Sequence, residues 1–249
     1  MKENIYLDRY AYPQTFIQNP VKSDLGMVVV IPCYHEPNIV ATLQSLLKCE
    51  LPSCHVEVIV VFNYGDQTKD EIKDEIHESY DKVSHWIKDN IKSGIEFLPI
   101  IADNLPKKHA GVGLARKIGM DEAVRRLESI NHDGIIVALD ADCTCEDNYL
   151  KSIFKHFHSN PATNGLNIYF EHPLDDHKET KLNEAIINYE LHLRYFVLAQ
   201  RYAEFPFAFQ TVGSCFAVKS NVYQKQGGMN RRKANGNSAY LWAKTKYLR

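Results

Sequence analysis

Two aspartates, Asp140 and Asp142, directly follow residues 134–139, the clearest buried-strand pattern in the sequence. Residues two apart in an extended chain point to the same side, so both carboxylates can face one crevice. Two like charges so close are unfavourable unless a cation lies near them. A divalent metal ion carrying a nucleotide diphosphate meets this requirement, because carboxylate oxygens bind the metal and the metal neutralises the phosphates. The alternative is that the two acids only end a strand and cap the next helix. The long apolar run before them favours the metal site.

Basic residues precede this pair. Arg116 follows two glycines near the predicted start of a helix, where a helix N-terminus and a cation together suit a diphosphate. An ordinary surface ion pair is an equally good interpretation of Arg116. Lys107 and Lys108 are interpreted as solvated charges. The stretch 111–116 superficially suggests a dinucleotide fingerprint, but it lacks a strand directly before it and has Arg116 in place of the third glycine, so we reject that interpretation.

Two further residues follow predicted strands and have open roles. Glu36 is predicted either to accept a hydrogen bond from a ribose or base, or to be a helix N-terminal acid favoured by the helix dipole. His172 is a candidate metal ligand or acid–base group, although most lone histidines have neither role.

Apolar, β-branched segments alternate with amphipathic ones along the chain. Strands are predicted over residues 27–31, 56–62, 95–98, 134–139 and 165–170, with short strands within 205–218. Helices are predicted over residues 37–47, 68–89, 114–127, 149–157 and 182–197. This alternation, with continuous apolar strands, predicts an α/β fold with a mostly parallel central sheet flanked by helices. Ligands of such sheets bind beyond the carboxyl ends of the strands, which here are the polar segments 33–36, 63–66 and 140–142.

Composition excludes several classes of protein. The 249 residues are 45% apolar and 24% charged, with a formal net charge of −2, which is ordinary for a globular protein and argues against a nucleic-acid binder that relies on bulk charge. No secretory pattern opens the sequence, and no apolar run approaches the ~18 residues of a membrane span, so at most a peripheral membrane contact is expected. Six scattered cysteines favour a reduced, cytoplasmic protein.

The order and spacing of five segments resemble the family-2 glycosyltransferases. These segments are Val28–Glu36, Asn63–Asp70, His109–Gly119, Leu139–Asp142, and Gly213–Val218 with Gly227–Met229. The resemblance implies a GT-A, Rossmann-like fold that binds a nucleoside-diphosphate sugar of the UDP or GDP type with Mn²⁺ or Mg²⁺. It also implies inverting transfer of the sugar to an acceptor hydroxyl.

The resemblance assigns roles residue by residue. Those implied for nucleotide-sugar binding are Pro32, Glu36, Asn63, Arg116 and Asp140, and those implied for the metal are Asp142 and Asp140. Glu36 would contact the nucleoside and Arg116 the nucleotide end. Asp140 would bind ribose or metal, and Asp142 the metal that bridges the phosphates.

Two departures from the family pattern stand out. Asn63 occupies the position where the family has an aspartate for the base. The family also has an acidic pair after its Gly-Gly turn, which supplies the general base, whereas residues 229–249 contain no carboxylate. The catalytic base is therefore unknown. The expected division is an N-terminal extension over 1–26, a nucleotide-sugar-binding region over 27–175, and an acceptor-side region over 176–249 that is expected to be C-terminally incomplete.

The resemblance thus implies a metal-assisted, inverting glycosyltransferase, and we expect it to act on a glycan or lipid-linked acceptor. Aromatic residues of the second half could form a stacking surface for the acceptor, although core packing explains them equally well: Tyr189, Tyr195, Phe196, Phe205, Phe207 and Phe209. One alternative is a catalytically impaired or truncated nucleotide-sugar-binding homologue. A sugar-phosphate nucleotidyltransferase is disfavoured, because residues 32–37 lack the glycine-rich loop of that class.

Overall fold

A six-stranded sheet forms the centre of the structure, a computed structural model that describes residues 4–174, 180–206, 208–209, 213 and 215–229. The strands are β1 (Leu25–Cys33), β2 (His55–Gly65), β3 (Ile95–Leu105), β4 (Ile135–Ala138), β5 (Gly165–Asn167) and β6 (Phe216–Lys219), in the order β3-β2-β1-β4-β6-β5. The first four strands are parallel to one another, and β6 runs antiparallel to both β4 and β5. The predicted mostly parallel sheet is confirmed.

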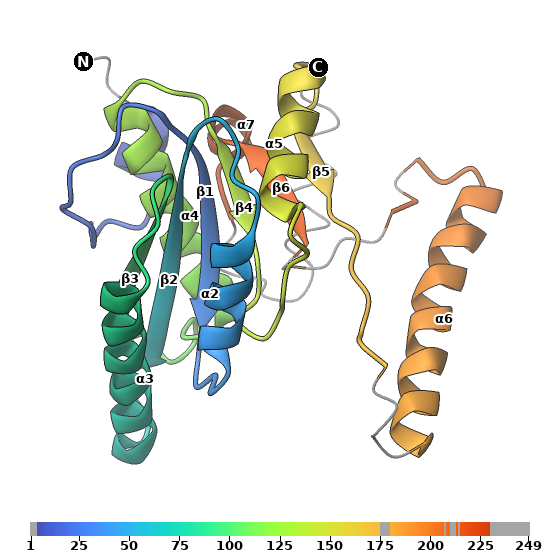
Figure 1. Ribbon diagram of the computed structural model, residues 1–249, viewed down its shortest axis with the longest axis horizontal. Coiled ribbons are helices and arrows are strands. Elements are labelled where there is room, and N and C mark those ends of the chain that lie inside the picture. The colour runs from blue at the N-terminus through green and yellow to red at the C-terminus, as the bar shows by residue number, and fades with distance from the viewer. Residues whose placement is uncertain (1–3, 175–179, 207, 210–212, 214, 230–249) are drawn as a thin grey trace.

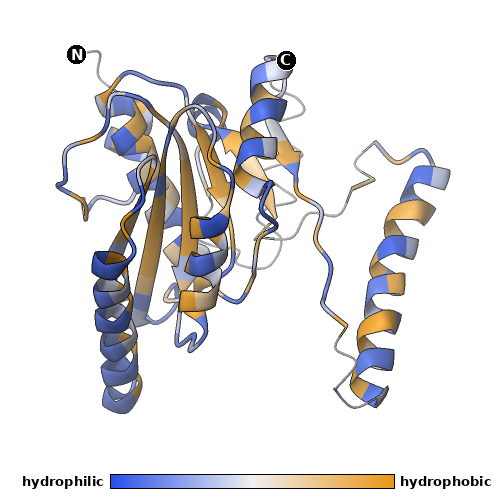
Figure 2. Cartoon of the chain, viewed as in Figure 1, coloured by the Kyte–Doolittle hydropathy of each residue, from blue (hydrophilic) through white to orange (hydrophobic). Residues whose placement is uncertain are grey.

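Helices cover both faces of this sheet (Figure 1). They are α1 (Ile5–Arg9), α2 (Ile39–Lys48), α3 (Asp70–Asp89), α4 (Val112–Ser129), α5 (Tyr149–Ser159), α6 (Thr180–Tyr202) and α7 (Ser220–Lys225). The core on one face includes α4, α7 and the N-terminal segment, and the core on the other includes α2, α3 and α5. Every residue of β1 and β2 is buried, and Figure 2 shows these strands as the most apolar part of the chain. Their continuous Val and Ile runs suit strands covered on both sides.

Helix α4 packs unusually closely on the sheet. A Cβ at Gly119 would collide with Cγ1 of Val30 and lie 2.9 Å from Cγ2 of Val61. Glycine is therefore required at this position, because it lets the helix backbone approach β1 and β2.

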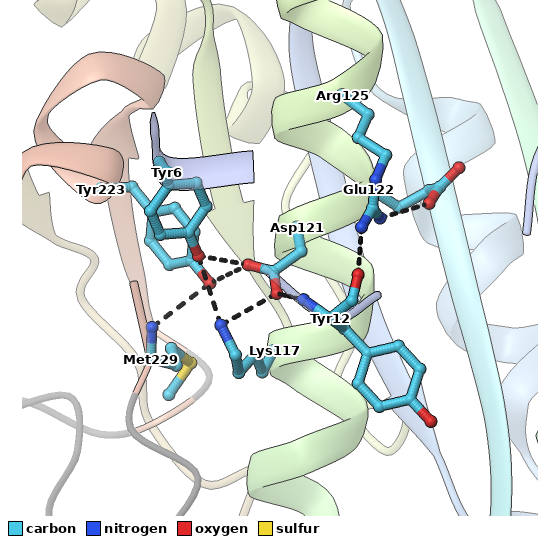
Figure 3. Close-up of polar contacts among 8 residues, drawn as sticks. All are labelled: Tyr6, Tyr12, Lys117, Asp121, Glu122, Arg125, Tyr223 and Met229. Atoms are coloured by element: carbon cyan, nitrogen blue, oxygen red, sulfur yellow. Dashed lines mark hydrogen bonds and ion pairs between the residues drawn. The ribbon is translucent and has the colours of Figure 1, made fainter. Parts of the chain in front are cut away.

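A buried polar network ties the N-terminal segment to α4 (Figure 3). The Asp121 carboxylate accepts hydrogen bonds from the Tyr6 hydroxyl at 2.5 Å, the Tyr223 hydroxyl at 2.9 Å and the Tyr12 backbone N–H at 2.7 Å. Lys117 Nζ lies 2.9 Å from the same carboxylate. Three parts of the chain that are distant in sequence therefore meet at one buried charge.

Neighbouring side chains of α4 extend this anchorage. Glu122 accepts a hydrogen bond from the Ile17 N–H at 3.1 Å, Arg125 donates to the Tyr12 carbonyl, and Arg126 donates to the Asn19 carbonyl at 3.1 Å. Residues 4–24 are thus held along α4 by backbone groups as well as by side chains.

Helix α6 stands apart from the sheet (Figure 1). Its Glu190 lies 2.6 Å from His172 Nδ1, and its Arg194 donates to the Tyr169 hydroxyl at 2.9 Å, so both link it to the segment after β5. Large apolar residues are exposed on α6 at Leu182, Ile187, Tyr189, Leu191, Tyr195, Phe196, Leu198 and Tyr202. No helix in the part of the chain that the structure describes is long and apolar enough to cross a membrane.

The strand boundaries differ from the sequence prediction in several places. β1 and β2 extend beyond the predicted 27–31 and 56–62, and β5 ends at Asn167 instead of residue 170. β3 continues to Leu105, and Pro99 is tolerated within it because β3 is an edge strand. β4 stops at Ala138 because a turn begins at Asp140, whose carbonyl accepts from the Cys143 N–H at 3.4 Å. Within 205–218, β6 is the strand found among the described residues.

Candidate functional site

The carboxyl ends of β1, β2 and β4 meet at one edge of the sheet. Pro32 pairs with Val61 near the end of β1, Asn63 lies two residues further along β2, and Asp140 follows β4. The parallel register therefore brings Pro32, Asn63 and Asp140 to one edge, as the sequence analysis expected.

Arg116 and Asp140 form an ion pair at this edge. The Arg116 guanidinium, from the second turn of α4, lies 2.5 Å from Asp140 Oδ1, and the two side chains are 6% and 33% exposed. Arg116 Nε is buried and has no hydrogen-bond partner in the described structure. A Cβ at Gly213 would lie 2.8 Å from Arg116 Nη1, so Gly213 closes over the guanidinium. Arg116 is thus buried and paired with an acid of the candidate site, and the alternative of an exposed surface pair is wrong.

Asp142 lies in the turn after Asp140 and is exposed. Its Oδ1 accepts a weak hydrogen bond from the Cys143 thiol, at 3.6 Å. Burial, and then the Asp142 and Asp140 carboxylates, raise the pKa of that thiol to about 12. Both carboxylates therefore lie near the Cys143 thiol, although the chain turns between Asp140 and Asp142.

The donor chemistry of this pair fits a hard divalent cation. Carboxylate oxygens are the ligands that Mg²⁺ and Mn²⁺ prefer, and Mg²⁺ commonly takes one or two carboxylates and completes its shell with phosphates and water. Among the described residues, Asp140 and Asp142 are not part of a cluster of three metal-ligating side chains. A metal held here would depend on phosphate oxygens, and Asp142 is the acid whose carboxylate is accessible for it.

Asn63 is a polar side chain with no partner in the described structure. It is 1% exposed, and neither its Oδ1 nor its Nδ2 has a hydrogen bond. Buried amides without partners are rare in folded proteins, and each calls for an explanation such as a ligand or an ordered water. An amide offers one acceptor and two donors, which suits the edge of a nucleobase.

The remaining candidates make other contacts. Glu36 Oε1 accepts the Asn38 N–H at 3.0 Å, so it stabilises the turn that leads into α2. Lys107 and Lys108 are exposed in a turn after β3, as the sequence predicted. His172 pairs with Glu190 of α6.

Two features could not be found by reasoning from the sequence. One is the contact of Gly213, a residue quoted above only as the start of a family segment, with Arg116: its lack of a side chain makes room for the guanidinium. The other is the inward charge of α4, where Lys117 and Asp121 are 3% and 0% exposed. Charges four residues apart on a helix normally predict an exposed face, so no sequence signal marked these as buried.

These features define a class of protein: an α/β fold of the Rossmann type with a polar ligand site at the carboxyl edge of a parallel sheet. Residues 28–225 match the family model described as Glycosyl transferase family 2. The chain belongs to this family, which confirms the resemblance found in the sequence.

Solved structures similar to this chain include TarS from S. aureus. The structure of TarS 1–349 has 15% sequence identity and a TM-score of 0.51, covering 88% of this chain and 55% of that one. A longer TarS structure gives 14% identity, a TM-score of 0.51, and coverage of 88% and 33%. The structure of TarS 1–349 in complex with UDP-GlcNAc has 16% sequence identity and a TM-score of 0.50, and the match covers 88% of this chain and 53% of that one. The chain thus spans about half the length of the 1–349 structures. No curated protein matches it. These likenesses concern the fold, which is of the GT-A type as predicted.

Proposed function

We propose that this chain binds a nucleoside-diphosphate sugar of the UDP or GDP type and transfers its sugar, with inversion and with Mn²⁺ or Mg²⁺, to a hydroxyl of a glycan or lipid-linked acceptor. The observation that carries the proposal is the grouping of the Arg116–Asp140 pair, the exposed Asp142 and the unpartnered Asn63 amide at one sheet edge. TarS 1–349, a protein of similar fold, has been solved in complex with UDP-GlcNAc, which makes UDP-sugars the first donors to test.

Each residue has a distinct role in the proposed mechanism. The Asn63 amide would bind the base, Pro32 and Glu36 would border the nucleoside, and Arg116 would stabilise the nucleotide end of the donor. Asp142, with Asp140, would hold the metal, which supplies positive charge for the departing diphosphate. The acceptor hydroxyl would attack the anomeric carbon from the opposite side.

The acceptor would approach the second half of the chain, residues 176–249. Tyr189, Tyr195 and Phe196 of α6 are more than half exposed and could stack on sugar rings. Phe207 lies outside the described residues. The proposed partners are therefore a donor nucleotide and a glycan or lipid-linked acceptor in the cytoplasm, without nucleic acid and with at most peripheral membrane contact.

A second candidate function is a nucleotide-sugar binder that no longer catalyses transfer. It is favoured by the sequence after Gly228, where residues 229–249 contain no aspartate or glutamate to serve as the general base. Loss of a positioned base typically costs ~10²–10⁴-fold in rate. Release of UDP or GDP from the bound sugar, measured beside binding calorimetry, separates the two functions, because an inactive protein binds without turnover.

Two substitutions test the proposed site. Asn63→Leu removes amide atoms that have no partner in the described structure, so it should leave the melting temperature unchanged and weaken nucleotide binding about 10-fold, or about 1.4 kcal/mol. Asp142→Asn should abolish the gain in affinity that Mn²⁺ produces. Asp147→Asn, an exposed acid five residues later, is the matched control. Unchanged calorimetric affinity in both site variants, with and without Mn²⁺, would show that donors do not bind at this edge.

A further inference from the structure

A second polar cluster lies at the opposite, amino-terminal edge of the sheet. His55 is the first residue of β2, Glu57 lies two residues later, and Glu96 is the second residue of β3. Glu57 and Glu96 are register partners in the parallel β2–β3 pair. All three side chains come together on the face of the sheet that α4 covers, since Glu57 contacts Arg126 of that helix. We call His55, Glu57 and Glu96 the amino-edge cluster.

The potential ligand atoms of this cluster are close together. One imidazole nitrogen and one oxygen from each carboxylate all lie within 4.8 Å of one another. His55 Nε2 and Glu96 Oε2 are 3.8 Å apart, too far for a hydrogen bond. Two ligands of a tetrahedral zinc ion are separated by about 3.3 Å, given metal–ligand bonds of about 2.0–2.1 Å. Movement of a few tenths of an ångström would bring His55 and Glu96 to that separation.

The His55 imidazole provides an independent indication of a ligand. His55 is 9% exposed, and its Nε2 is buried without a hydrogen-bond partner in the described structure. A buried imidazole nitrogen that lies near a carboxylate without a hydrogen bond to it, within a group of three potential ligands, is suited to bind a metal.

The charges of the cluster also favour a cation. Arg126 binds the Glu57 carboxylate through Nε and through Nη2, the latter at 2.7 Å, and so balances one of the two acids. Among the described residues no lysine or arginine pairs with Glu96, so with a neutral imidazole the formal charges of the four side chains sum to −1. Each carboxylate oxygen has two acceptor sites, so Glu57 can bind Arg126 and still offer a lone pair to a metal.

We propose that the amino-edge cluster binds a divalent cation of the zinc type, through His55 Nε2 and one oxygen each from Glu57 and Glu96, with water in the fourth position. The Glu96 side chain is 35% exposed, which gives the ion and its water access from solvent. The mixed nitrogen–oxygen donor set selects zinc, in contrast to the all-oxygen pair at Asp140 and Asp142.

The bound ion would stabilise the fold at a distance from the donor site. It would join the starts of β2 and β3, and through Glu57 and Arg126 it would reinforce the contact of α4 with Asn19 of the N-terminal segment. Binding to the folded chain alone raises the melting temperature with ligand concentration. Zinc should therefore stabilise the protein in the absence of any nucleotide.

The test uses the full chain stripped of metal, with ZnCl₂ as the probe. Zinc stoichiometry and affinity are measured by competition with a chromophoric chelator, and melting temperatures are measured in parallel. Glu96→Gln and His55→Gln should each bind one zinc ion fewer than the parent, or bind that ion at least 10- to 100-fold more weakly. Loss of an outer-shell partner alone typically weakens metal binding by that factor. His85→Gln, at an exposed histidine of α3, is the control and should match the parent.

Two further measurements keep the result decisive. Glu96 is partly exposed, so Glu96→Gln remains informative even if the more buried His55→Gln fails to fold. All six cysteines are free thiols and could also bind zinc. The absorption spectrum of the Co²⁺ form distinguishes thiolate ligands from nitrogen and oxygen ligands. Equal zinc binding by the parent and Glu96→Gln, a Co²⁺–thiolate absorption band, or no zinc binding at all would overturn the proposal.

Discussion

The buried charge of Asp121 gives the sharpest prediction about stability. Asp121 is fully buried and receives two tyrosine hydroxyls, one backbone N–H and the Lys117 ammonium (Figure 3). Asp121→Asn keeps the shape of the side chain but removes the carboxylate charge that pairs with the buried Lys117 ammonium. The single amide oxygen can accept at most two of the four surrounding donors.

The expected loss follows from these contacts. Breaking a buried ion pair by removing one partner costs about 3–5 kcal/mol, a large share of the 5–15 kcal/mol typical of a whole protein. With a urea m-value of about 3 kcal/mol/M, the unfolding midpoint falls by about 1–1.7 M. Tyr6→Phe removes one hydrogen bond to the same carboxylate and should cost about 1.5–3 kcal/mol.

The assay is urea unfolding followed by circular dichroism. Glu128→Gln is the matched control, because it makes the same change of charge on an exposed residue of α4 and should shift stability by no more than about 0.5 kcal/mol. A double-mutant cycle with Lys117→Met should show a coupling energy between the two positions, since Lys117 and Asp121 form a buried ion pair. If Asp121→Asn unfolds at the same urea concentration as Glu128→Gln, the buried network does not hold the N-terminal segment in place.

Three further predictions concern Tyr6, Gly119 and Asp140. Burial and the neighbouring Asp121 carboxylate raise the pKa of the Tyr6 phenol well above its usual value near 10. Above pH 10 the folded state therefore keeps a proton that the unfolded state loses, and this group lowers the free energy of unfolding by about 1.4 kcal/mol per pH unit. Tyr6→Phe should remove that contribution from the pH dependence of the urea midpoint, measured from pH 9 to 11. Gly119→Ala should lower the melting temperature, because overpacking against the sheet costs about 1–3 kcal/mol and outweighs a gain in helix propensity of about 1 kcal/mol. Gly111→Ser is the control and should not lower it, because a Cβ at Gly111 meets open space. Equal melting temperatures of the two variants would contradict the close packing of α4. Asp140→Asn should destabilise the fold by about 1–3 kcal/mol by leaving a buried guanidinium unpaired, while the exposed Asp142→Asn should not, so thermal melts that rank them the other way would refute the geometry.

Much of the fold was determined by local sequence patterns. The runs 27–31 and 56–62 are continuous and β-branched, and amphipathic segments separate them, so they could be buried only as parallel strands between helices. The same patterns placed Asp140 and Asn63 at strand ends, because a strand end is marked by the change from apolar to polar residues. Family membership followed from the order of these short segments.

Other features depended on contacts between distant residues. Arg116 could be an exposed or a buried partner until the packing of α4 brought its guanidinium to Asp140, 24 residues away in sequence. The resemblance assigned Asn63 to the nucleotide-sugar site, but only the fold showed that its amide is buried without a hydrogen-bond partner among the described residues.

The amino-edge cluster shows the same limit most clearly. His55 and Glu57 are close in sequence, but Glu96 joins them only through the β2–β3 register. The sequence by itself determined which residues form strands and helices, because hydrophobic periodicity is local. The tertiary structure alone decided which polar side chains meet, because register and helix packing depend on the whole core.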